Sequence, residues 1–256
     1  MNSTAKHVDQ WCINFEFCLS RMSTSARNTG ALPKYIQLSE LIIRDIDAGR
    51  LLDGERLPPE REMAQSHGTS IGTLRKALAD LEKKGLLRRV HGSGNYVQKS
   101  ATPSGLYAMF RLELLDGGGL PTAQVLDVAV LDKPQDLPSF GTSTFATRIR
   151  RHRFLNDVAI AVEEIWLDAS VGTLNRSMLS DSLYQTYLKR LNFWIMRAED
   201  RVSLAQMPSW SPPGFVAPRS VCGYIERLSW SSDALPIEFS RTWYDPNRAV
   251  YVQRLK

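Results

Sequence analysis

Two arginines separated by a single residue, Arg151 and Arg153, lie in a stretch whose residue pattern predicts a β-strand over residues 146–154. Alternate side chains of a strand project from the same face, so both guanidinium groups point the same way. Two guanidinium groups can bind a phosphate or carboxylate through forked, charge-assisted hydrogen bonds. The pair therefore indicates a pocket for an anion; the alternative is that both are surface arginines paired with nearby acids.

Polar groups that could hold the rest of such a ligand occur in two other predicted elements. A strand over residues 235–244 places one carboxylate and three hydroxyls on one face: Glu238, Ser240, Thr242 and Tyr244. The segment Ser182-Leu183-Tyr184 begins a predicted helix over residues 182–191, whose free N–H groups and positive dipole end favour an anion. Alternatively, Ser182 serves only as the N-cap of that helix.

The distribution of charge suggests a second chemistry. The formal net charge is +5, and the first 100 residues contribute +4 of it, with 15 Lys and Arg against 11 Asp and Glu. Against only two acids, residues 75–99 hold seven cations: Arg75, Lys76, Lys83, Lys84, Arg88, Arg89 and Lys99. Such a cluster either binds the phosphates of nucleic acid or is the solvated face of a helix, and the elements that carry it decide between the two.

Those elements are three predicted helices and a hairpin. The helices cover about residues 33–48, 58–67 and 70–84, and the third repeats apolar residues at i, i+3, i+4 and i+7. Two short strands, 86–90 and 95–98, follow around a glycine-rich turn. This order predicts a winged helix-turn-helix, whose third helix enters the major groove of DNA. Its outward residues would reach the DNA: Thr73, Arg75 and Lys76.

The sequence divides into four parts. Residues 1–31 are polar and turn-rich and are expected to form a disordered tail, in which Met22 is an alternative start. Residues 32–98 are the predicted winged helix-turn-helix, and residues 99–105 a linker. Residues 106–256 are predicted to be an antiparallel α+β domain, with strands over 106–115, 123–131, 146–154, 159–167, 219–229 and 235–244.

Composition argues against several other classes of protein. No stretch is apolar enough to span a membrane or to serve as a signal peptide, so a cytoplasmic protein is expected. The three cysteines are an odd number, which does not suit a secreted disulfide framework. The sequence contains no nucleophile elbow, no cysteine placed with a base and no zinc-ligand spacing. We therefore expect no catalytic residue, no metal and no cofactor.

Four motifs of the N-terminal part resemble the GntR family of bacterial transcription regulators: LPPEREMA at 57–64, TLRKAL at 73–78, LEKKGL at 81–86 and HGSGNYV at 91–97. The resemblance implies that Arg61 and Arg75 contact DNA in the major groove. It implies that the tip of the hairpin, His91 and Gly92, reaches the minor groove. Further contacts are expected from the start of the third helix: Ser70, Thr73 and Lys76.

One position departs from that family. GntR regulators commonly carry a base-reading arginine directly after the serine that opens the third helix, and this sequence has Ile71 there. Ile71 either extends the apolar core or contacts the methyl group of a thymine. The usual operator of the family therefore cannot be assumed.

The C-terminal part resembles the ligand-sensing UTRA domain of the HutC branch of GntR regulators, which shares its fold with chorismate lyase. The resemblance rests on residues 151–154, 182–184, 197–202 and 236–244. It implies that an anion is held by Arg151, Arg153 and Ser182, with Leu183 and Tyr184 beside the serine. It implies that the rest of the ligand contacts Glu163, Glu238 and Tyr244. Neighbouring Glu163 and Glu164 point to opposite faces, so only one of them can line the pocket.

Together these features predict a homodimeric bacterial repressor. It would bind a double-stranded DNA operator with inverted-repeat symmetry and release it when a small anionic metabolite, such as a sugar phosphate or related catabolite, binds the C-terminal domain. A second hypothesis is a DNA-binding regulator without an effector. A third is a lyase-like enzyme, which the fold alone does not support because arginines and glutamates can bind a ligand without reacting.

Overall fold

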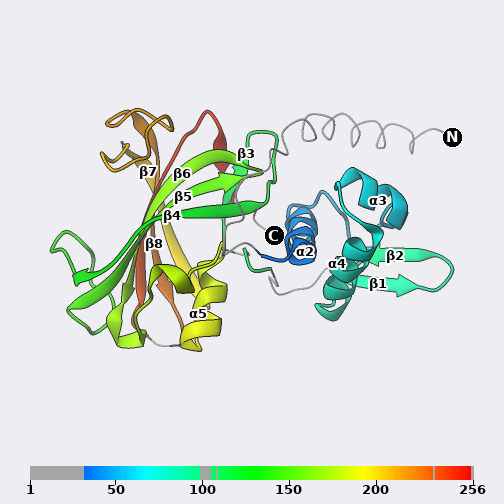
Figure 1. The fold of residues 1–256 in the computed structure, drawn as a ribbon, viewed down its shortest axis with the longest axis horizontal. Helices are drawn as coiled ribbons and strands as arrows, with labels where there is room; N and C mark the ends of the chain where they lie inside the picture. Colours follow the sequence, from blue (N-terminus) through cyan, green and yellow to red (C-terminus); the bar gives the residue numbers. More distant parts are fainter. Residues whose placement is uncertain (1–31, 99–104, 108, 233, 255–256) are drawn as a thin grey trace.

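The computed structural model describes residues 32–98, 105–107, 109–232 and 234–254. The predicted tail and most of the predicted linker lie outside the described residues. Figure 1 shows two lobes, one of helices with a small hairpin and one built on a large sheet, with helix α2 (Lys34–Asp47) between them. None of the described helices is both long and apolar enough to cross a membrane.

The N-terminal lobe contains the predicted helices and hairpin. After α2 come α3 (Glu60–Ser66), α4 (Ile71–Lys83), β1 (Leu87–Val90) and β2 (Gly94–Val97). The stripe of α4 is buried in the core that it shares with α2 and α3: Leu74, Ala77, Leu78 and Leu81. Ser70 caps α4, since its Oγ accepts a hydrogen bond from the Thr73 N–H at 3.1 Å. The order of elements is that of a winged helix-turn-helix.

The C-terminal lobe is built on a six-stranded antiparallel sheet in the order β4-β5-β6-β9-β8-β7. The strands are β4 (Pro121–Asp132), β5 (Phe145–Leu155), β6 (Val158–Asp168), β7 (Arg197–Gln206), β8 (Val221–Trp230) and β9 (Glu238–Tyr244). Helix α5 (Leu183–Leu191) packs on one face, where Tyr187 is fully buried against Ile149 and Ile165. A separate pair, β3 (Leu112–Leu114) and β10 (Ala249–Tyr251), covers the other end of that face. Two 3-10 turns, η2 (Ala169–Val171) and η3 (Arg176–Met178), join β6 to α5.

The strand predicted over residues 106–115 is wrong except at Leu112–Leu114. The residues before β3 instead pass between the lobes, and their backbone groups bond to side chains of α2. The Leu106 N–H donates to Glu40 at 2.7 Å, and the Leu112 carbonyl accepts from Arg44 at 2.9 Å. Before Arg111, whose carbonyl accepts from the Val252 N–H at 2.8 Å, hydrogen bonds to α2 therefore stand in place of strand pairing at Leu106 and Phe110. We call residues 105–107 and 109–112 the connecting segment.

Two strands were not predicted. Strand β7 lies at the edge of the sheet, and most of its residues are exposed, so its sequence lacks the apolar alternation that marks a half-buried strand. Strand β10 has three residues, too few for a pattern.

A close approach between β8 and β9 fixes the position of the Tyr244 ring. Gly223 lies opposite Tyr244 in the register, and a Cβ at Gly223 would fall 2.1 Å from an atom of the ring. The ring therefore lies across β8 in space that any other residue at position 223 would occupy.

We expect Gly223→Ala to lower the free energy of unfolding by roughly 1–3 kcal/mol, because the Tyr244 ring must leave its place. Gly72→Ala in α4 is the matched control, since a Cβ there would meet its nearest atom at 3.9 Å. That substitution should be neutral or slightly stabilising. Denaturant unfolding of the three proteins measures both effects, and equal stability of Gly223→Ala and wild type would contradict the expectation.

Candidate functional site

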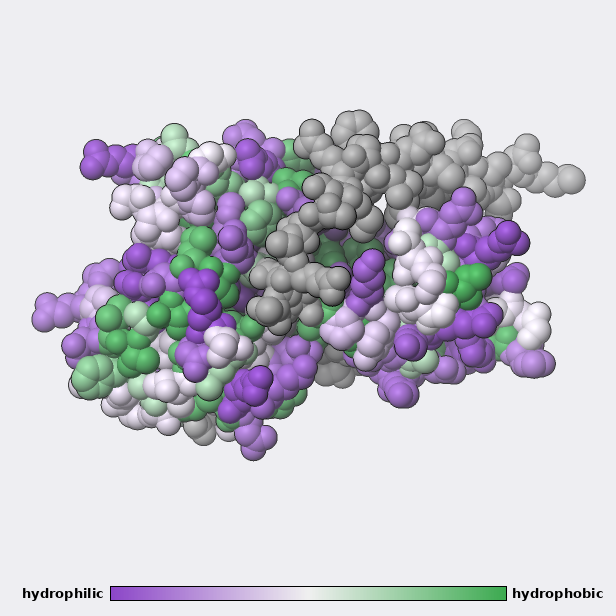
Figure 2. Space-filling view, viewed as in Figure 1, coloured by the Kyte–Doolittle hydropathy of each residue, from purple (hydrophilic) through white to green (hydrophobic). Residues whose placement is uncertain are grey.

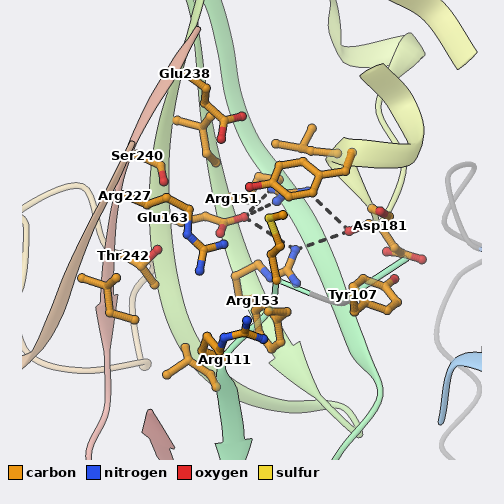
Figure 3. Close-up of a pocket in the computed structure, with 18 of the residues that line it drawn as sticks. Tyr107, Arg111, Arg151, Arg153, Glu163, Asp181, Arg227, Glu238, Ser240 and Thr242 are labelled. Atoms are coloured by element: carbon orange, nitrogen blue, oxygen red, sulfur yellow. Dashed lines mark hydrogen bonds and ion pairs between the residues drawn. The ribbon is translucent and has the colours of Figure 1, made fainter. Parts of the chain in front are cut away.

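A cavity lies on the sheet face between α5 and the β3–β10 pair, with the connecting segment on the side of the N-terminal lobe (Figure 3). The structure brings seven of the eight predicted ligand residues to its lining: Arg151, Arg153, Glu163, Ser182, Leu183, Tyr184 and Glu238. Tyr244 lies further along the same face of β9, outside the lining. Its ring packs over Gly223 and against the apolar residues around β3 and β10.

The register of the antiparallel sheet explains why these side chains meet. In one row across the sheet, Arg151 on β5 lies beside Glu163 on β6, which lies beside Thr242 on β9. In the neighbouring row, Ser240 on β9 lies beside Arg227 on β8. Because alternate residues face the cavity, four strands each contribute polar groups to one surface.

Glu163 and Glu164 take opposite faces, as their adjacency in a strand predicts. Glu163 faces the cavity and pairs with Arg151, whereas Glu164 accepts from Arg150 Nε at 2.7 Å on the other side of the sheet.

The two predicted anion-binding arginines are buried, with 4% of Arg151 and 3% of Arg153 exposed. Glu163 pairs with both, and the backbone carbonyl of Asp181 accepts from Arg151 Nη1 at 3.4 Å and from Arg153 Nη1 at 3.3 Å (Figure 3). The Nε of Arg153 has no partner within the described residues, and burial lowers the pKa of this guanidinium. A buried cation with an unused N–H is suited to an incoming anion.

Sequence reasoning missed four polar groups of the lining: Tyr107, Arg111, Asp181 and Arg227. Arg227 is held in place by Asp200 of β7, through hydrogen bonds of 2.5 and 2.7 Å. Arg227 lies two residues after Ile225 on a predicted strand, so the sequence indicates that the two side chains share one face of the sheet, the face that lines the cavity. Its partner lies on β7, which was not predicted, so the pair could not be recognised.

The charge of the lining favours an anion. Four arginines, Arg111, Arg151, Arg153 and Arg227, face three carboxyl groups, Glu163, Asp181 and Glu238, which leaves a net charge of +1 if all are ionised. Burial raises the pKa values of Asp181 and Glu238, and it lowers the pKa of Arg153, because each charged form loses its hydration.

Glu238 occupies the other end of the cavity, away from Arg153 in Figure 3. Its carboxyl group is 2% exposed and accepts hydrogen bonds from two neutral donors, the Ser229 hydroxyl at 2.8 Å and the Tyr187 hydroxyl. One end of the cavity is therefore cationic, and the other carries hydrogen-bond acceptors.

The residues predicted to contact DNA belong to α3, α4 and the β1–β2 hairpin. Arg61, Arg75, Lys76, His91 and Gly92 are exposed, and Figure 2 shows that hydrophilic residues predominate on the visible face of this lobe. The hydroxyl of Ser70 is also exposed but is engaged in capping α4 beside Thr73, which is half-buried.

One carboxylate organises the cations of this surface. Glu60, the first residue of α3, accepts from Arg75 Nε of α4 at 2.6 Å and from Arg89 Nη2 of β1 at 3.2 Å. Glu60 therefore links α4 to the β1–β2 hairpin, the wing of the winged helix-turn-helix.

The comparison with known families agrees with this architecture. Residues 34–97 match the family described as bacterial regulatory proteins, gntR family, and residues 117–249 match the UTRA domain. The chain belongs to the GntR family. Its predicted α+β class and its predicted family are confirmed.

The relatives of this GntR protein are regulators. It is 52% identical to the HTH-type transcriptional regulator SmoD of Agrobacterium fabrum over 229 residues, covering 89% of this chain and 98% of SmoD. It is 30% identical to the HTH-type transcriptional repressor NagR of Bacillus subtilis, covering 86% of this chain and 94% of NagR. The chain is therefore a DNA-binding transcriptional regulator with a UTRA effector domain and is not an enzyme.

Solved structures are more distant. The structure of a possible transcriptional regulator, YydK from Bacillus subtilis, is 21% identical in sequence and superposes with a TM-score of 0.49. The match covers 88% of this chain and 100% of the YydK chain.

The buried Glu238 carboxyl gives a testable pH dependence. Because burial raises its folded-state pKa, its contribution to stability is present below the unfolded pKa of about 4.3 and is lost as the pH rises through the folded pKa. The unfolding free energy of wild type minus that of Glu238→Gln should therefore fall as the pH rises from about 4 to 8. Denaturant unfolding at a series of pH values measures this difference, in which Asp181 and the other acids cancel. A difference that stays constant with pH would refute the assignment.

Proposed function

We propose that this regulator is a homodimeric repressor whose UTRA pocket binds a small anionic metabolite, and that binding lowers its affinity for an inverted-repeat operator. The observation that carries the proposal is the buried pair Arg151 and Arg153, which face a cavity with an Arg153 N–H unpartnered among the described residues. A buried cation without full hydrogen bonding is costly, and an anion would supply the missing acceptor. The similarity to NagR, a transcriptional repressor, supports repression as the mode of action.

The other polar groups indicate the chemistry of the rest of the ligand. Ser240 and Thr242 offer hydroxyls beside the arginines, and Glu238 offers acceptors at the far end. A sugar phosphate or related catabolite combines an anionic group with several hydroxyls and so matches both ends. We assign its contacts to seven residues: Arg151, Arg153, Glu163, Ser182, Leu183, Tyr184 and Glu238.

We assign the DNA contacts to three elements of residues 32–98: α3, α4 and the β1–β2 hairpin. The major groove would be read from α3 and α4 by Arg61, Ser70, Thr73, Arg75 and Lys76. The tip of the wing would reach the minor groove through His91 and Gly92. Residues 106–256 then form the effector domain, and residues 99–105 link it to the DNA-binding domain.

Effector binding can reach the DNA-binding lobe because the connecting segment is shared by the cavity and α2. The Phe110 ring contacts two guanidinium groups: that of Arg153 in the cavity lies 4.7 Å from the ring centroid, and that of Arg44 on α2 lies 5.4 Å from it. Phe110 also lines the cavity. A ligand that draws Arg153 toward itself must therefore change the contact that Phe110 makes with α2.

A second link runs through Glu40 of α2. Its Oε2 accepts from the Leu106 N–H at 2.7 Å, and its Oε1 accepts from Lys84 Nζ at 3.1 Å, directly after the end of α4. Movement of the connecting segment would thereby be passed to the helix that we propose reads DNA. We propose that these contacts differ between the ligand-free and ligand-bound states, as an allosteric effect requires.

Two substitutions should separate the two functions. Arg153→Ala should keep operator binding but abolish release by a ligand, which in a typical allosteric protein is a change of roughly 5–150-fold in affinity. Arg75→Ala should weaken operator binding by roughly 1–3 kcal/mol while keeping the ligand response. The first measurement is a thermal-shift screen of the protein against sugar phosphates and sugar acids. Gel shifts on the DNA upstream of the protein's own gene then follow, with each compound that stabilises the protein.

The same assays distinguish this proposal from the alternative of a DNA-binding regulator without an effector. Tight DNA binding with no stabilisation by any anion in the screen would favour a regulator without an effector. Loss of operator binding in Arg153→Ala would mean that this residue is structural.

The coupling has its own test. Phe110→Leu keeps an apolar side chain but removes the aromatic ring that both guanidinium groups contact, so it should reduce the ratio of the operator affinity without ligand to that with ligand. Phe145→Leu is the control, because Phe145 is 48% exposed at the start of β5. Both affinities are measured for each variant by fluorescence anisotropy, and an unchanged ratio in Phe110→Leu would exclude this route.

A further inference from the structure

Ile71 is an exposed apolar residue on the surface that we propose binds DNA. It is the first residue of α4 and is 40% exposed, whereas the apolar residues that follow on the helix, Leu74, Ala77, Leu78 and Leu81, are at most 2% exposed. Ile71 is also absent from the core that those four residues share. The sequence leaves two roles open for Ile71: extension of the core or contact with a thymine methyl. The structure excludes the first of these, because Ile71 is exposed.

Ile71 carries the only large apolar side chain among residues 70–73, the first turn of α4 and its N-cap. The hydroxyls of Ser70 and Thr73 lie 2.9 Å apart and bond to each other, and Gly72 has no side chain. Arg75 follows one helical turn later on the same side, with 65% of its side chain exposed. Its bond to Glu60 uses Nε, which leaves the two Nη nitrogens for another partner.

Resting on the proposed placement of α4 in the major groove, we propose that Ile71 selects thymine through its C5-methyl group, next to a guanine read by Arg75. The methyl of thymine is the apolar group on the base edges of the major groove, whereas guanine, adenine and cytosine present donors and acceptors that isoleucine cannot satisfy. Arginine, with a fork of two nitrogens, suits the O6 and N7 atoms of guanine.

The spacing of the two bases follows from helix geometry. Side chains four residues apart on a helix have their Cβ atoms about 5–6 Å apart, and successive bases rise about 3.4 Å. The thymine therefore lies about one or two base pairs from the guanine in each half of the operator.

The test replaces thymine with uracil, which removes only the methyl group. Duplexes that bind the full chain are first selected from a random double-stranded library, and each thymine of a selected site is then changed to uracil in turn. We expect a loss of about fourfold in affinity at a thymine in each half-site, because contact with about one methyl is lost. The loss should disappear in Ile71→Ala and persist in Ile71→Val, which keeps a branched side chain.

Leu52→Ala serves as the matched control, since Leu52 is an apolar residue with 60% exposure in the turn before α3. It should leave the uracil pattern unchanged. If wild type binds its selected sites but no uracil weakens binding, or if Ile71→Ala keeps the wild-type pattern, the inference is overturned and the proposed function stands. If the full chain selects no sequence at all, the proposed function fails with it.

Discussion

The buried carboxylate of Glu40 joins three elements of the structure: α2, the end of α4 and the connecting segment. It is fully buried on α2, and it accepts from Lys84 at the end of α4 and from the backbone of Leu106 in the connecting segment. Burial raises its pKa, while the ion pair with Lys84 opposes that shift. Removing either donor would leave a buried carboxylate short of partners, which is costly, so the three elements hold one another in position.

The close packing of the connecting segment against Glu40 also explains why residue 105 is a glycine. A Cβ at Gly105 would fall 2.9 Å from Glu40 Oε2 and 3.0 Å from the side chain of Ile43, so the connecting segment can approach α2 this closely only without a side chain there. The close approach puts the Leu106 N–H within reach of Glu40 and places Phe110 against Arg44. Local sterics at one residue thus fix how the cavity wall meets the DNA-binding lobe.

The parts of this arrangement that are local could be predicted from the sequence. The stripe of α4 and the shared face of Arg151 and Arg153 follow from helical and strand periodicity within a few residues. Arg227 and Asp200 meet through the register of β7 with β8, which depends on residues far apart in the chain. The register of β8 with β9 similarly sets Tyr244 over Gly223. A single strand pattern therefore gives the face of a side chain but not its neighbours.

Polar contacts hold the junction between the lobes together, and this suits the change of shape that we propose. Arg44 binds the carbonyls of Leu112 and Phe110, and burial lowers its pKa to about 10. Hydrogen bonds to carbonyls and a contact with one ring can be exchanged for others at small net cost, whereas an apolar interface would have to separate. The cavity side of the same ring meets Arg153, whose charge is incompletely satisfied among the described residues. In the proposed mechanism, an anion that supplies the missing acceptor to Arg153 acts on a guanidinium group in contact with Phe110, and the polar junction lets α2 exchange hydrogen-bond partners as it moves.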